Sequence, residues 1–169
     1  MMEPGARPKP GLRPFLPADV TVLAEILRAS IEELTSDDYS EAQQQAWASV
    51  ADDEAEFGRR LAQAMTLLAV LDGAPVGFAS VERAEHLDML YVHPAAAGRG
   101  VGSMLVDAVV KLAAARGLSK LTADVSDSAL GFFRRRGFVP QQRKSILLGD
   151  EWLASTTMHK DLAAKEQAQ

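Results

Sequence analysis

The amino-acid sequence predicts an α/β protein of the α+β kind, a three-layer fold whose central mixed, mostly antiparallel sheet of about seven strands carries helices on both faces. Three observations predict this fold class. Apolar residues recur at helical spacing within residues 19–64, an Asp-Gly hairpin signal stands at 72–73, and a strand, a glycine-rich turn, a helix and a strand follow one another over 86–125. In the last unit a helix connects two strands. Such a crossover connection is typical of parallel strands, so we expect one parallel pair in the sheet.

The first third of the chain predicts one edge strand and three helices. The strand covers residues 12–16, and Pro14 inside it favours a place at the edge of the sheet. Helical spacing begins at Asp19 and marks one buried face with the apolar residues Val22, Leu23, Ile26, Leu27, Ile31 and Leu34. Ser40 is a suitable N-cap for a second helix, and residues 53–64 predict a third.

The rest of the chain predicts strands and two further helices. Asp72-Gly73 between two apolar runs is a strong hairpin signal. We expect strands at 66–71, 76–81, 86–92, 118–125, 138–148 and 151–159, and helices at 101–116 and 128–136. Gly117 is a C-terminal stop for the longer helix, and the last two strands form a closing hairpin across Gly149-Asp150.

Composition and charge exclude several classes of protein. The chain has 169 residues, 47% of them apolar, which suffices for one core, so we expect a single domain at 12–162 between a flexible lead-in at 1–11 and a flexible tail at 163–169. A formal net charge of −5 provides no field that would hold nucleic acid. The absence of cysteine excludes disulfides, a thiolate nucleophile and a cysteine-based zinc site, and we expect no metal.

The N-terminal residues and the longest apolar runs bear on cellular location. Four prolines occur by Pro14, and no apolar segment resembles the core of a secretion signal. Apolar stretches such as 65–71 are too short to cross a bilayer. We therefore expect a cytoplasmic protein without a membrane partner.

The most informative segment runs from Leu90 to Leu105 and has the order strand, glycine-rich turn, helix N-terminus. Gly98, Gly100 and Gly102 let the backbone approach a ligand closely, and the free amides of a helix's first turn attract phosphate. The glycines alone are equally consistent with a tight structural turn. A dinucleotide site is disfavoured, because the Gly-x-Gly-x-Gly spacing differs from Gly-x-Gly-x-x-Gly.

This segment and residues 121–138 closely resemble the GNAT superfamily of acetyl-CoA-dependent N-acetyltransferases, of the bacterial small-molecule type. In that family the amides of a Gln/Arg-x-x-Gly-x-Gly/Ala turn hold the pyrophosphate of acetyl-CoA. The resemblance places these amides on Gly98, Arg99, Gly100, Val101, Gly102 and Ser103. The usual leading Gln or Arg is Ala97 here, so we expect weaker contacts, with a charge-assisted contribution from Arg99.

The resemblance also implies contacts for the rest of the cofactor. In the family the fourth and fifth strands splay apart, and the pantetheine arm bonds to the backbone of the fourth strand. The corresponding cofactor contacts here are Leu90, Tyr91 and Val92, together with Ser126, Phe132 and Phe133. The arginine run 134–136 fits either the 3′-phosphate of coenzyme A or a solvated helix face.

Catalysis in this family requires a deprotonated amine and a stabilised leaving thiolate. The resemblance makes Asp88 the candidate base, with a structural or substrate-binding carboxylate as the alternative role, and Glu85 and His86 are nearby alternative bases. The family's usual tyrosine acid is replaced by Phe133, which has no proton to donate. Water, Tyr39, Ser126 or Ser128 is then left to assist the thiolate, although Ser128 is better explained as a helix cap.

The acceptor end is expected in the helical region before the sheet. Tyr39, Trp47, His86 and Asp88 are the candidate acceptor contacts, and the two aromatic residues fit equally well as core residues that seat a helix. The resulting hypothesis is direct transfer of an acetyl group from acetyl-CoA to an amine of a small molecule. The alternatives are an inactive acyl-CoA sensor and a protein-lysine acetyltransferase. We also expect a homodimer through the closing hairpin, residues 143–160.

Overall fold

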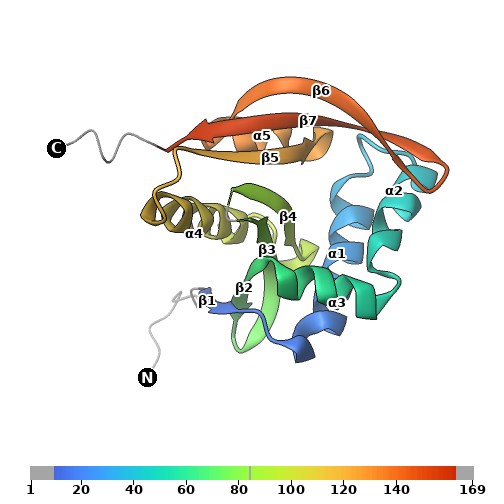
Figure 1. Ribbon diagram of the computed structural model, residues 1–169. Helices are drawn as coiled ribbons and strands as arrows, with labels where there is room; N and C mark the ends of the chain where they lie inside the picture. The colour runs from blue at the N-terminus through green and yellow to red at the C-terminus, as the bar shows by residue number, and fades with distance from the viewer. Residues whose placement is uncertain (1–9, 84, 163–169) are drawn as a thin grey trace.

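The computed structural model describes residues 10–83 and 85–162. Its seven-stranded sheet has the order β1-β2-β3-β4-β5-β7-β6 (Figure 1). The strands are β1 (Gly11–Pro14), β2 (Met65–Leu71), β3 (Ala74–Glu82), β4 (His86–Val92), β5 (Lys120–Ser126), β6 (Val139–Leu148) and β7 (Glu151–Asp161). Neighbouring strands are antiparallel except β4 and β5, which are parallel. This confirms the predicted mixed α/β sheet and its single parallel step.

Helices cover both faces of the sheet. They are α1 (Val20–Leu34), α2 (Glu41–Ala48), α3 (Glu54–Gln63), α4 (Val101–Ala115) and α5 (Leu130–Arg135). Leu68, Phe78 and Met89 pack with α1 and α3, whereas Ala69, Ala79 and Leu87 belong to the core beneath α4 and α5. The described helices include none with the length and apolar character of a bilayer span.

Most predicted elements are found within one or two residues of their expected bounds. Ser40 caps α2 with a hydrogen bond from the Gln43 amide at 3.1 Å, and Asp72 and Gly73 both take positive φ angles in the β2–β3 hairpin. β1 lies at the sheet edge and begins at Gly11, one residue before the expected domain start. The expected lead-in up to residue 9 and the tail 163–169 lie outside the described residues.

The predicted capping role of Ser128 is wrong. The Ser126 hydroxyl accepts the Ala129 amide at 3.3 Å and thereby caps the short 3-10 turn before α5. Ser128 instead donates its hydroxyl to the Asp38 carboxylate at 2.7 Å. The strand therefore leads directly into a capped helical turn, and Ser128 is left to contact the loop between α1 and α2.

β4 carries an irregularity next to the point where its pairing with β5 ends. Ser80 pairs with Met89 and Val81 pairs with Leu87, so Asp88 is an extra residue in the β3–β4 register, as in a β-bulge. On the other side, β4 pairs with β5 only at His86 and Leu87. The two strands diverge beyond Leu87, as the resemblance implied.

A glycine in β3 allows α4 to sit close to this divergent strand. A β-carbon at Gly77 would lie 3.0 Å from both the Tyr91 carbonyl oxygen and Val101 Cγ1. Any larger residue would push the N-terminal turn of α4 away from β4. Gly77 thus helps to set the distance between the glycine-rich turn and the end of β4.

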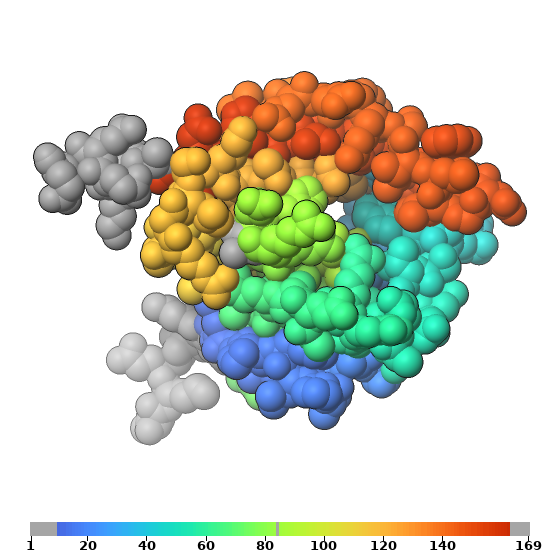
Figure 2. All heavy atoms as spheres, in the orientation of Figure 1, coloured from blue at the N-terminus to red at the C-terminus, as the bar shows by residue number. Residues whose placement is uncertain are grey.

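The β6–β7 hairpin extends along the top of the molecule and over α2 (Figures 1 and 2). Tyr39 anchors it. Its hydroxyl donates to the Ala154 carbonyl at 2.6 Å and accepts the Asp127 amide at 2.9 Å. Gln43 of α2 adds a hydrogen bond to the Trp152 carbonyl at 2.8 Å. These bonds join the helical region to the far half of the sheet.

We expect Tyr39→Phe to lower the free energy of unfolding by about 1–3 kcal/mol, because two backbone groups lose their partner. Urea denaturation at constant m-value measures this loss. Asp37→Asn, at an exposed neighbouring position, is the control and should change stability by less than about 0.5 kcal/mol. An unchanged denaturation midpoint for Tyr39→Phe would contradict the anchoring role.

Candidate active site

Three cavities lie around the divergence of β4 and β5. A cavity of about 220 Å³, here called the cofactor-side cavity, reaches from α1 to Gly102 and Phe132. A cavity of about 290 Å³, the acceptor-side cavity, lies beneath the β6–β7 hairpin. A third, of about 70 Å³, fills the opening between the two strands. Trp47, Tyr91 and Ser126 line all three, so the two larger cavities meet at these residues.

The glycine-rich turn presents backbone rather than side chains to the cofactor side. Gly98 and Gly100 have φ angles of 77° and 81°, which other residues rarely adopt. Gly100 is the N-cap of the 15-residue helix α4 and offers no capping side chain, which leaves the amides of the first turn available to a ligand. The positive end of the helix dipole adds to their attraction for an anion.

The wall of the cofactor-side cavity comes from β4 and α5. Leu90, Val92, Gly102 and Phe132 line it. In the described chain β4 has no β5 partner beyond Leu87. The β5-facing backbone groups of Leu90 and Val92 are therefore available to a ligand that carries amides.

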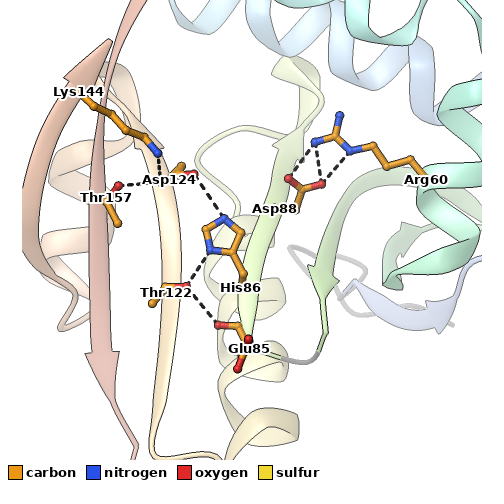
Figure 3. A network of polar contacts seen from close by, with 8 residues as sticks. All are labelled: Arg60, Glu85, His86, Asp88, Thr122, Asp124, Lys144 and Thr157. Carbon is orange, nitrogen blue, oxygen red and sulfur yellow. Dashed lines mark hydrogen bonds and ion pairs between the residues drawn. The ribbon is translucent and has the colours of Figure 1, made fainter. Parts of the chain in front are cut away.

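Asp88 forms an ion pair with Arg60 of α3 (Figure 3). Arg60 Nε and Nη2 donate to the two carboxylate oxygens at 3.0 and 2.8 Å. Burial lowers the pKa of Arg60, but the hydrogen bonds and charge of Asp88 outweigh it, so the net pKa is raised. Both side chains line the acceptor-side cavity. Sequence reasoning missed Arg60, because a lone arginine 28 residues before its partner carries no local signal.

His86 points away from Asp88 and toward β5 (Figure 3). Its Nδ1 lies 2.7 Å from the Thr122 hydroxyl, and its Nε2 lies 3.5 Å from the Asp124 carboxylate. Asp124 also accepts from Lys144 at 2.9 Å and from Thr157 at 2.9 Å. Burial raises the pKa of Asp124, and these donors reverse the shift and lower it.

Asp124 lines the acceptor-side cavity, whereas His86 is not among the described residues that line it. Asp124 was also missed from the sequence. Asp124 alternates with Leu121, Ala123 and Val125 on the predicted strand, so its side chain lies on the face opposite the α4 core. This alternation was the sequence signal that could have identified Asp124.

The two aromatic residues predicted at the acceptor end do lie there. Tyr39 is buried, and burial raises the pKa of its hydroxyl against the opposing effect of the Asp127 amide. The proton of this hydroxyl is used by the Ala154 carbonyl. Trp47 Nε1 donates to the Tyr91 hydroxyl at 2.9 Å. Both aromatic rings line the acceptor-side cavity as well as packing in the core.

Phe133 of α5 is a core residue that lies at the opening between β4 and β5. It is 4% exposed and packs edge-on against Phe132 and Phe138 at ring separations of 5.4 and 5.0 Å. Its ring borders the small cavity between β4 and β5. Arg136, from the arginine run, lies over Phe132 and pairs with Asp107 at 3.1 Å.

Comparisons with known proteins agree with this architecture. The family model described as acetyltransferase (GNAT) domain matches residues 35–162. The N-acetyltransferase YafP of Escherichia coli is 38% identical over 87% of this chain and 93% of its own length. The peptidyl-lysine N-acetyltransferase YjaB of Salmonella typhimurium is 31% identical over 73% of this chain and 69% of its own length.

A solved structure extends the comparison to three dimensions. The crystal structure of a GCN5-related N-acetyltransferase from Rhodopseudomonas palustris is 56% identical, has a TM-score of 0.90, and covers 95% of this chain and 100% of that one. The similarity thus extends over nearly the whole length of both chains. The chain belongs to the GNAT acetyltransferase family, as an N-acetyltransferase.

Proposed function

We propose that this enzyme binds acetyl-CoA in the cofactor-side cavity and transfers the acetyl group directly to an amine of a small molecule in the acceptor-side cavity. The observation that carries this proposal is the meeting of the two cavities at Trp47, Tyr91 and Ser126. A direct transfer needs both reactants at one place, with no covalent enzyme intermediate. The divergence of β4 and β5 provides that place.

The cofactor is assigned to the residues that offer backbone groups. Amides of Gly98 through Ser103 hold the pyrophosphate at the start of α4, where free donors and the helix dipole favour an anion. The pantetheine arm lies against Leu90–Val92 and bonds to the unpaired backbone groups of Leu90 and Val92. Phe132 packs beneath it, and Phe133 supports that ring.

Asp88 is assigned as the base that takes the proton of the attacking amine. Its side chain is only 13% exposed and borders the acceptor-side cavity. Because each of its oxygens already accepts from Arg60, the proton goes to the remaining lone pairs, directly or through water. Tyr39 and Ser126 are assigned to positioning: the first holds the hairpin over the cavity, and the second caps the end of β5.

A small acceptor fits the shape and lining of the acceptor-side cavity. Its lining combines apolar residues of the hairpin, Ile146, Leu148 and Leu153, with the carboxylates of Asp88 and Asp124. An amine on a compact apolar body matches this mixed lining. The second candidate acceptor is a lysine side chain of a protein, which the 31% identity to a peptidyl-lysine N-acetyltransferase favours.

An acceptor screen tests the two candidates. Purified enzyme with acetyl-CoA is offered a panel of small primary amines and, separately, lysine-bearing peptides, and free thiol release is followed together with product mass. We expect acetylation of small amines at higher kcat/KM than of any peptide. Faster acetylation of peptides would replace the small-molecule proposal, and no release with any amine would overturn the proposed function.

We also propose a cytoplasmic homodimer. The cosubstrate is an intracellular metabolite, and β6 forms an edge of the sheet. Leu147 and Trp152 are paired across the β6–β7 hairpin and are 53% and 62% exposed, which is unusual for such large apolar residues. This surface is the proposed contact between two copies of the chain.

Leu147→Ser with Trp152→Ser should shift the dimer toward monomer, because the proposed contact loses its apolar area. Light scattering over a concentration series measures the molar mass. Leu12→Ser, which removes an exposed leucine at the opposite edge strand, serves as the control and should leave the mass unchanged. A monomeric wild-type protein would contradict the assignment.

Gly100→Glu should weaken acetyl-CoA binding, since a carboxylate there repels the pyrophosphate. The matched control is Gly100→Asn, because asparagine tolerates a positive φ and adds no charge. Titration calorimetry should show the Glu variant at least about tenfold weaker than the Asn variant, or about 1.4 kcal/mol. Equal affinities would mean that no anion approaches this turn.

Asp88→Asn should lower kcat about 100-fold or more, as expected for loss of a base, while the Kd for acetyl-CoA stays unchanged. Arg60→Gln is the informative partner variant: it breaks the ion pair but keeps the carboxylate, and its kcat should fall less. An equal fall in kcat for the two variants would contradict the assignment of Asp88 as the base, because it would mean that Asp88 acts only through its ion pair with Arg60.

A further inference from the structure

The position at which this family usually places a tyrosine acid is occupied by Phe133, which cannot donate a hydrogen bond. The leaving sulfur still develops negative charge that needs a donor. We propose that the hydroxyl of Tyr91 supplies this donor and hydrogen-bonds to the sulfur of coenzyme A as the thioester breaks. This assignment rests on the proposed function, because it requires donor and acceptor to meet between the two cavities.

Tyr91 lies where the reactants must meet. It lines the cofactor-side cavity, the acceptor-side cavity and the opening between β4 and β5, a property shared among described residues only with Trp47 and Ser126. Its ring packs against Phe78 at 5.6 Å and Trp47 at 6.4 Å, measured between ring centroids. The side chain is thus held in place from two sides.

The hydrogen bonds of these residues show which proton is available. Trp47 Nε1 donates to the Tyr91 oxygen at 2.9 Å, so it uses a lone pair of that oxygen and leaves the hydroxyl proton for another acceptor. No acceptor for this proton is found among the described residues. The nearby Tyr39 differs, because its proton is donated to the Ala154 carbonyl at 2.6 Å.

The acidity of the two hydroxyls favours Tyr91 over Ser126. Each oxygen accepts one N–H, from Trp47 and from the Ala129 amide respectively, so each keeps a proton that it can donate. A phenol is the stronger hydrogen-bond donor, because it is more acidic than an aliphatic alcohol. The indole N–H strengthens the donor further by drawing electron density from the phenolic oxygen.

The protonation state of Tyr91 is compatible with this role. Burial raises the pKa of Tyr91 to about 12, while the Trp47 hydrogen bond and the charge of Arg60 act in the opposite direction. The hydroxyl is therefore protonated at neutral pH. Because a thiol loses its proton at lower pH, with a reference pKa of about 8.5 for cysteine, Tyr91 donates a hydrogen bond and keeps its proton.

The amine nitrogen forms a bond to the thioester carbonyl carbon, the carbon–sulfur bond breaks, and its electron pair goes to sulfur. The proton lost by the amine goes to Asp88 or to water at that carboxylate, and it reaches the thiolate after product leaves the site. Tyr91 and Trp47 are unchanged at the end of the cycle.

The decisive comparison is a double-mutant cycle of Tyr91→Phe and Trp47→Phe. Tyr91→Phe keeps the ring and removes only the hydroxyl, and we expect kcat to fall about 10²- to 10³-fold, as for loss of one transition-state donor, with KM for acetyl-CoA unchanged. Trp47→Phe keeps the hydroxyl and removes its orienting N–H, so a smaller loss is expected. The double variant should lose less than the product of the two single losses.

Calorimetric affinity for acetyl-CoA and the melting temperature of each variant separate a chemical effect from misfolding. Unchanged kcat in Tyr91→Phe, a loss confined to KM, or independent effects in the cycle would overturn the assignment while acetyl transfer by the wild type still supports the proposed function. A large kcat loss in Ser126→Ala with none in Tyr91→Phe would move the role to Ser126. Absence of wild-type transfer would overturn both proposals.

Discussion

The extra residue in β4 is the constraint on which the rest of the site depends. Strand side chains alternate between faces, so one inserted residue reverses the alternation of everything that follows. Leu87 accordingly packs beneath α4, whereas Met89, two residues later, packs against α1 and α3. The extra residue is Asp88. It follows Leu87, the last residue of β4 that pairs with β5, and its carboxylate pairs with Arg60.

The electrostatics of the acceptor-side cavity follow from pairing across different elements. Asp88 is matched by Arg60 of α3, and Asp124 is matched by Lys144 of β6. Each carboxylate is thereby partly neutralised, which permits two of them to border one cavity without strong mutual repulsion. An incoming amine meets carboxylates that are already oriented, and little rearrangement is needed before attack.

Local signals in the sequence were sufficient for the elements and for the glycine-rich turn. The strand expected at 86–92 matches β4, and Ser40 and Gly117 are found at the helix ends where their residue types predicted them. The bulge could not be predicted, because neither glycine nor proline marks it in the sequence. Contacts such as Arg60 with Asp88, or Trp47 with Tyr91, join distant segments and need the folded chain.

The way in which the hairpin is attached has a consequence for divergence among related enzymes. Tyr39 and Gln43 bind the carbonyl oxygens of Ala154 and Trp152, which every residue type possesses. The hairpin side chains that border the acceptor can therefore be exchanged without loss of the attachment. Selection for a new acceptor can act on positions such as Ile146 and Leu148 while the backbone above the cavity keeps its place, so specificity and architecture are able to evolve separately.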